Sequence, residues 1–226
     1  ARMAVKCSLA AVMASGWRGS TPSKIFMRFW MRGAQWLTRP CCARCVASQG
    51  YADTTIADIV REAGVSRRTF YECFTDKPGC LIALHEAASQ NALAVLRSAI
   101  QSDRGWEVQV EQAIAAYLGA LALNPVLMRA LFVDILGLGM PGLAARRRAN
   151  QQLADFMLDV VNQPPAGPVL LDRAMAMAVV GGINELVLQA IEQDQVAQLA
   201  DLVAPASALL RAVVTAQSVD PNFKEK

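Results

Sequence analysis

Aromatic residues are scarce in this chain of 226 residues, at 6%, and there is a single histidine. The apolar fraction is nevertheless 54% and is dominated by Ala, Leu and Val, a mixture that favours helices over strands. No strand-like alternation of apolar and polar residues and no internal repeat is present. No uninterrupted apolar run reaches the roughly 20 residues that span a bilayer. We therefore expect an all-α fold in a soluble protein without a membrane segment.

Clusters of residues that could carry out catalysis or bind a metal are also scarce. The six cysteines include one close group, Cys41, Cys42 and Cys45, whereas structural zinc needs four Cys or His ligands in paired spacings. We interpret these residues as reduced core or solvent thiols of a cytoplasmic protein. The single histidine, His85, has no motif around it and is expected on a helix face. No acid–base pair, nucleophile motif or phosphate loop occurs, so we expect no enzyme activity, metal or cofactor.

Charge is unevenly distributed along the chain. Residues 1–52 carry eight Lys and Arg and no Asp or Glu, whereas residues 103–226 carry nine basic and 13 acidic residues. The formal net charge is only +3, so the total is weak evidence for nucleic-acid binding. Any such argument depends on local motifs.

Breaks in helical periodicity divide the chain into segments. We expect helices at about 55–63, 66–74, 77–101, 106–123, 125–136, 142–162, 171–193 and 196–217. A proline-rich linker at 163–168 separates two of them. The expected domains are a basic, poorly specified extension at 1–40, a DNA-binding domain at 41–102, a helical domain at 103–219 and a tail at 220–226.

The segment 54–81 has the pattern of a helix-turn-helix. Thr55 and Asp58 form a capping box at the start of a short amphipathic helix. Gly64 is suited to the left-handed turn that ends this helix, and Ser66 can cap the next. Phe70 supplies the buried side of the second helix, together with Phe74. Such a motif holds its second helix at an angle that enters the major groove.

This segment resembles the TetR family of bacterial repressors. The resemblance covers about 46–84 and rests on Gly50-Tyr51, Thr54-Thr55, Asp58-Ile59, Ala63-Gly64-Val65-Ser66, Thr69-Phe70-Tyr71, Phe74 and Lys77. Upstream the pattern departs from the family, because Pro40 interrupts the expected first helix and shortens it to about 41–48. A defective homologue with a disrupted first helix is therefore one alternative.

The candidate DNA-contacting residues follow from the motif and the resemblance. The first turn of the second helix places four residues toward base edges: Ser66, Arg67, Arg68 and Thr69. Arginine can bind guanine O6 and N7 with two hydrogen bonds. The resemblance implies phosphate contacts by Thr55, Tyr71 and Lys77. The family commonly has a small residue, often Gly, where Arg68 stands.

For residues beyond 101 the resemblance implies a helical domain that binds a small effector and dimerises through its last two long helices. Candidates for an apolar effector pocket are Tyr117, Met128, Phe132, Phe156 and Met177, although such residues are more often plain core. Asn184 and Glu185 are polar within an apolar helix, where they orient an effector, tie a dimer or face solvent. The cluster 146–148 of three arginines is expected on a solvated helix face.

These observations predict a ligand-responsive repressor that binds a near-palindromic double-stranded operator as a homodimer and releases it when a small apolar effector binds. The alternative is a helical enzyme or small-molecule-binding protein with a non-functional helix-turn-helix.

Overall fold

The computed structural model describes residues 41–46, 48–101, 103–123, 125–162 and 171–219. Every regular element in these ranges is helical, so the all-α prediction is confirmed. The extension at 1–40, the linker at 163–168 and the tail at 220–226 lie outside the described residues.

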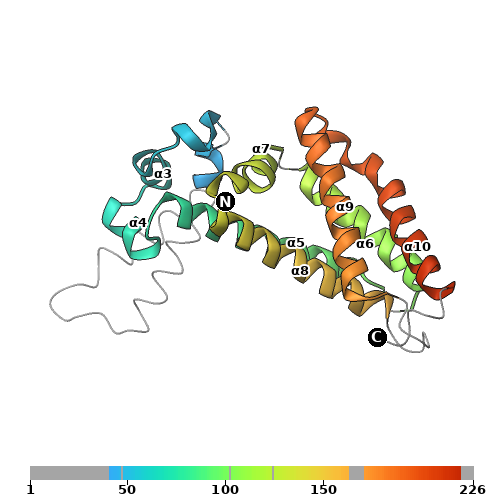
Figure 1. The fold of residues 1–226 in the computed structure, drawn as a ribbon. Coiled ribbons are helices and arrows are strands. Elements are labelled where there is room, and N and C mark those ends of the chain that lie inside the picture. The colour runs from blue at the N-terminus through green and yellow to red at the C-terminus, as the bar shows by residue number, and fades with distance from the viewer. Residues whose placement is uncertain (1–40, 47, 102, 124, 163–170, 220–226) are drawn as a thin grey trace.

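Three short helical elements gather at one end of the molecule (Figure 1). A leading helical segment comprises residues 41–46 and 48–53. It is followed by α3 (Ile56–Ala63) and α4 (Arg67–Cys73). Gly50, two residues beyond the end expected at Ser48, adopts the left-handed conformation (φ +80°) that commonly ends a helix, and a further helical turn follows at residues 51–53.

Longer helices form the rest of the molecule. α5 (Lys77–Ala99) runs beside α8 (Met140–Val161), while α6 (Trp106–Ala122), α9 (Arg173–Glu192) and α10 (Val203–Val219) gather at the far end (Figure 1). One apolar core extends from Cys42 in the leading segment to Val214 in α10. α5 contributes side chains to this core along its length, so it packs against both ends of the molecule.

The segment expected as one helix at 125–136 is instead broken, so that prediction is wrong. It comprises α7 (Pro125–Arg129), one π-helical turn, η1 (Ala130–Asp134), and a 3-10 turn, η2 (Leu136–Leu138). This irregular segment packs closely against the start of α8 at Gly142. A Cβ atom at Gly142 would lie 1.9 Å from the carbonyl oxygen of Ile135, so only glycine lets α8 approach this irregular segment.

Two helices are long and apolar enough, by length and composition, to cross a membrane: Arg173–Glu192 and Val196–Gln217; a third would arise if the bent pair Trp106–Ala122 and Leu127–Leu138 acted as one span. The expectation from uninterrupted apolar runs missed them, because isolated polar residues such as Asn184 and Arg211 interrupt both. The described chain itself buries 44% of the first apolar window and 28% of the second. The exposed residues of these two helices are mostly polar residues and alanines, and Met175 is the exposed large apolar side chain of α9.

Candidate DNA-binding surface and ligand cavities

Local hydrogen bonds set the frame of the helix-turn-helix. The Thr55 hydroxyl accepts the backbone N–H of Asp58 (3.2 Å), and the Asp58 carboxylate accepts the backbone N–H of Thr55 (3.0 Å). Gly64 ends α3 with φ +65°, as its position in the motif predicts. The Ser66 hydroxyl then caps α4 by accepting the backbone N–H of Thr69 (3.1 Å). The predicted helix-turn-helix is thus formed by its own caps.

The apolar face of α4 anchors it to the rest of the domain. Phe70 is fully buried and packs against Phe74 with ring centroids 5.3 Å apart. Ile59 and Cys42 are also fully buried in the same core. The leading segment therefore supports α4 despite the irregular sequence before it, which argues against a defective homologue.

The opposite face of α4 is exposed and basic. Arg67 and Arg68 both lie in its first turn and face solvent. Arg68 forms an ion pair with Glu72 (3.1 Å), but its side chain remains 89% exposed. Among the described residues, Arg67 has no ion-pair partner. Tyr71, one turn further on, is 57% exposed and meets the Phe70 ring edge to face. This face presents two guanidinium groups and a phenol to an approaching partner.

Two other predicted contact residues have structural hydrogen bonds. Thr69 is buried, and its hydroxyl lies 2.9 Å from that of Ser66. Thr55 donates its hydroxyl proton to Asp58 (2.6 Å). The side chains of Ser66, Thr69 and Thr55 thus hold the ends of α3 and α4, and only the backbone N–H groups at those helix starts remain directed toward an anion.

Lys77 connects the start of α5 to the leading segment. Its ammonium donates to the carbonyls of Tyr51 (2.8 Å), Ala52 (3.3 Å) and Thr54 (2.8 Å). It also lies 4.3 Å from the centroid of the Tyr51 ring. An ammonium has three protons to donate, and here each has a carbonyl acceptor. In this geometry Lys77 fixes α5 to the end of the preceding helical turn.

Electrostatics reinforce the α3 cap. Hydrogen bonds from the hydroxyl and backbone N–H of Thr55 lower the pKa of Asp58 to about 2, with smaller contributions from Gln49 and Arg61. The carboxylate is therefore ionised throughout the neutral range and stabilises the positive end of the helix.

The buried cysteines belong to this same domain. Cys41, Cys42 and Cys45 are all buried on the leading segment, and Cys42 shares a side-chain hydrogen bond with Cys80 of α5, which lowers the pKa of the Cys42 thiol. Within the described ranges there is no group of three or more His, Cys, Asp or Glu that could hold a metal ion.

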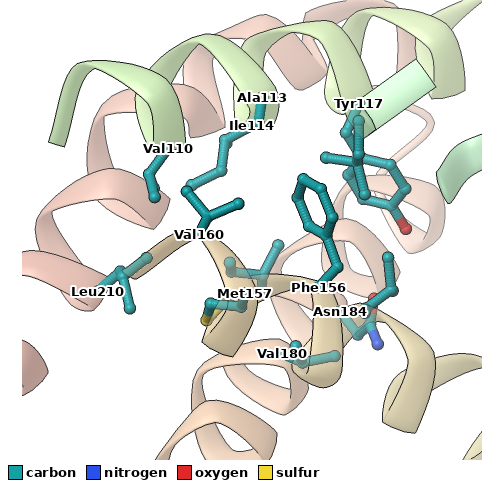
Figure 2. A pocket seen from close by; sticks show the side chains of 13 residues that line it. Val110, Ala113, Ile114, Tyr117, Phe156, Met157, Val160, Val180, Asn184 and Leu210 are labelled. Carbon is teal, nitrogen blue, oxygen red and sulfur yellow. The ribbon is translucent and has the colours of Figure 1, made fainter. Parts of the chain in front are cut away.

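The larger domain contains two neighbouring cavities. The first has a volume of about 60 Å³ and lies between α6, α8, α9 and α10. Figure 2 shows its apolar side chains, with Val110 and Ile114 opposite Val160, and with Asn184 at one end. Its few polar groups include the Tyr117 phenol, whose burial raises its pKa to about 12. This cavity suits an apolar group.

The second cavity has a volume of about 150 Å³ and shares Tyr117, Leu153 and Asn184 with the first. Its lining differs in character from side to side. Most of its polar residues come from α5, α8 and α9, whereas α6, α7 and η1 contribute mainly apolar residues; α5 and α8 also contribute the apolar Ala88, Ala92, Ala149 and Leu153. The π-helical turn η1 directs Leu131 and Phe132 to this lining, and such turns are frequent at functional sites.

The predicted pocket residues divide between these cavities. Tyr117 lines both, Phe156 lines the first, and Met128 and Phe132 line the second. Met177 lines neither cavity; it is half-buried against the core.

Sequence reasoning missed the polar part of the lining. His85, expected on a helix face, is only 6% exposed and lines the second cavity. Burial lowers the pKa of His85, with Arg146 and Arg148 adding to the lowering and Glu86 opposing it. Arg146, expected on a solvated face, lines the same cavity. Only the fold reveals these positions, because helical periodicity does not show which turn of α5 faces which turn of α8.

Asn184 resolves one of the open alternatives. It is buried, lines both cavities and donates to the Asn150 amide oxygen (2.9 Å), whereas the neighbouring Glu185 is exposed.

The paired glycines before Asn184, Gly181 and Gly182, differ in their surroundings. A Cβ at Gly182 would contact Leu209 at 3.1 Å, but at Gly181 it would meet no atom within 4 Å. Close packing therefore accounts for one glycine of the pair.

Comparison with known proteins supports this architecture. Residues 43–84 match the family model of bacterial regulatory proteins of the tetR family, a segment that includes most of the leading helical segment, α3, α4 and the start of α5. No curated protein sequence matches the chain.

Solved structures match over most of the chain. The fatty acid degradation regulator FadR from Bacillus halodurans has a TM-score of 0.67 at 18% identity, covering 85% of this chain and 96% of its own. FadR from Bacillus subtilis, solved in complex with stearoyl-CoA, has a TM-score of 0.64 at 20% identity, covering 77% and 96%. A putative TetR-family regulator from Syntrophomonas wolfei has a TM-score of 0.64 at 16% identity, covering 81% and 96%.

The capped α3–α4 pair has the architecture of a helix-turn-helix, with a helical domain behind it. The resemblance to the TetR family is confirmed: its family model matches residues 43–84, and the described chain has the fold of TetR-family regulators.

Proposed function

We propose that this protein is a cytoplasmic, ligand-responsive transcriptional repressor that binds a near-palindromic operator as a homodimer. The observation that carries the proposal is the exposed basic first turn of α4, with Arg67 and Arg68 directed to solvent while Phe70 anchors the helix from behind. This is the arrangement by which a recognition helix reads base edges in the major groove.

The contacts of this surface fall into two groups. Arg67 and Arg68 read base edges, and Tyr71 contacts a flanking phosphate together with the backbone N–H groups at the start of α3. Ser66, Thr69 and Lys77 hold the helices in place through the hydrogen bonds described above. Loss of these three would weaken binding by disturbing the geometry of the reading surface.

Dimerisation is supported by the exposed alanines of α10 at positions 204, 208 and 212, which form a face of small residues on the last helix. A second copy packed on α9 and α10 would cover it and set two recognition helices about one DNA turn, or 34–36 Å, apart. The domain division proposed is a DNA-binding unit at 41–102 and a ligand-binding and dimerisation unit at 103–219, with α5 packed against both.

Ligand response is supported by the cavities beside α5. The similar FadR from Bacillus subtilis was solved with stearoyl-CoA, and we propose that this chain also takes an effector with an apolar body. A ligand between α5, α6 and α8 that favours a different position of α5 would shift the two recognition helices away from operator spacing.

The test is Arg67→Ala, measured by fluorescence anisotropy on an operator selected from genome fragments. Removal of a base-reading arginine costs about 1–3 kcal/mol of discrimination, so we expect roughly tenfold or greater weakening and a loss of sequence preference. Arg97→Ala removes the same charge from an exposed site at the far end of α5 and should change neither. Unaltered affinity and preference in Arg67→Ala would rule out the recognition surface.

A further inference from the structure

The second cavity has the lining of a site for a molecule with one polar end and one apolar end. His85 and Ser89 of α5, with Arg146 and Asn150 of α8, form its polar side. The large apolar residues of the lining come mostly from α6, α7 and η1: Leu121, Leu127, Met128, Leu131 and Phe132. Cavities that bind small molecules commonly combine apolar walls with a few polar groups that fix orientation.

His85 provides a buried polar group that needs a partner. Its side chain is 94% buried, and among the described residues its Nδ1 atom has no hydrogen-bond partner. A buried polar atom without a hydrogen-bond partner is destabilising, because it has lost its contact with water and gained nothing in return. A ligand that hydrogen-bonds to this nitrogen would satisfy it. The unsatisfied Nδ1 atom of His85 therefore favours a ligand in the cavity.

The charge of the lining determines what kind of ligand fits. Arg146 is the one cationic arginine or lysine that lines the cavity, and the lining contains no Asp or Glu. The nearby Glu86 is already paired with Arg148 (2.7 Å), and Arg146 has no ion-pair partner among the described residues. A carboxylate is the ligand group that a planar guanidinium binds with two parallel hydrogen bonds.

We propose that the second cavity binds a small organic monocarboxylate, with its carboxylate between Arg146 and His85 and its apolar body against Met128, Leu131 and Phe132. The volume of about 150 Å³ limits the body to about one aromatic ring or a short alkyl chain, since a cavity of roughly 150 Å³ holds benzene. This site deepens the proposed ligand response, and its effect on DNA rests on that function.

The two cavities are adjacent, so we expect the length of the ligand to affect its binding at this site. They share Tyr117, Leu153 and Asn184, so a longer alkyl chain attached to the same carboxylate would reach the apolar first cavity by displacing these side chains. A carboxylate with a compact body needs no such displacement.

The experiment measures binding of benzoate to the full-length protein by isothermal titration calorimetry, with benzyl alcohol as an uncharged probe of similar shape. We expect benzoate to bind at least tenfold more tightly than benzyl alcohol. Arg146→Met should weaken benzoate tenfold or more and leave benzyl alcohol unchanged. Arg147→Met, on the solvent side of the same helix turn, should leave both unchanged.

Two further variants keep the test decisive. Arg146→Lys retains the charge without the planar pair of donors and should lie between wild type and Arg146→Met in benzoate affinity. His85→Phe should weaken benzoate binding severalfold. Its circular dichroism spectrum should match that of wild type, and its unfolding should remain cooperative. Equal binding of benzoate and benzyl alcohol to wild type, or wild-type benzoate affinity in Arg146→Met, would overturn the proposal.

Operator binding is measured in the same samples with and without benzoate. Benzoate binding that depends on Arg146 but does not alter operator affinity would support the carboxylate site and contradict the ligand response. Intact operator binding with no detectable benzoate binding would contradict the carboxylate site and leave DNA recognition supported.

Discussion

Arg67 and Thr69 lie two residues apart on the first turn of α4, yet they have different roles. The Arg67 side chain faces solvent, while Thr69 is buried and its hydroxyl lies 2.9 Å from that of Ser66. The 100° rotation per helical residue explains the difference. Position within the motif predicted all of them as DNA contacts, but only the packed helix distinguishes the exposed Arg67 from the buried Thr69.

His85 leads to a prediction about pH. It is the only histidine in the chain, and burial lowers its pKa below the ordinary value of 6.5, with Glu86, Arg146 and Arg148 as the charged groups around it. The unfolded chain therefore takes up a proton near pH 6.5 while the folded chain takes it up only at lower pH. Its contribution to stability is complete above pH 6.5 and is lost as pH falls toward the folded pKa.

Urea unfolding at pH 7.5 and at pH 5.5 should therefore show a lower free energy of unfolding at pH 5.5 for wild type. His85→Gln, which does not titrate, should show a smaller difference between the two pH values. Carboxylates that begin to titrate in this range contribute equally to both proteins. Identical pH dependence in the two proteins would show that His85 does not reside in a desolvated position.

At the scale of the element, helix caps were predictable because they are local. Thr55, Gly64 and Ser66 carry out the capping and turning that their spacing indicates. Such motifs satisfy backbone groups within a few residues and need no tertiary information. The irregular segment between α6 and α8 was not predicted, and its close contact with α8 at Gly142 involves residues that no local pattern brings together.

Thr55→Ala tests how much the α3 cap contributes to the free energy of unfolding. It removes the hydroxyl that accepts the Asp58 N–H and donates to the Asp58 carboxylate, and we expect a loss of about 1 kcal/mol in the free energy of unfolding. Thr55→Ser retains these hydrogen bonds and should lose less than half as much. Urea unfolding of both variants at pH 7 makes the measurement, and equal losses would show that the hydroxyl does not cap the helix.

At the scale of the whole molecule, α10 presents a face of small residues to solvent. Exposed alanines at positions 204, 208 and 212 recur every fourth residue along α10, so they form one small-residue face on which another helix can pack closely. A second copy of the chain covers such a face in the dimer that we propose. α9 and the segment Val196–Gln217, which contains most of α10, are long and apolar enough to cross a membrane, but in this dimer they would form a protein interface.

Ala208→Arg should therefore disrupt the dimer, because a charged side chain would be buried at its centre. We expect a shift from dimer to monomer in size-exclusion chromatography with light scattering, and operator binding weakened by more than tenfold because half-sites are then bound singly. Ala94→Arg, an equally exposed alanine on α5, is the matched control. A dimer unaffected by Ala208→Arg would place the interface elsewhere.

The sequence by itself determined the helical class, the helix-turn-helix between Thr55 and Phe74, and the position of two arginines on the first turn of its second helix, since periodicity and capping are local properties of the chain. Only the tertiary structure decided which residues line the cavities. His85 and Arg146 lie 61 positions apart and line one cavity because α5 and α8 pack side by side. Helix packing depends on side chains distant in sequence, and no local pattern encodes which turns will meet.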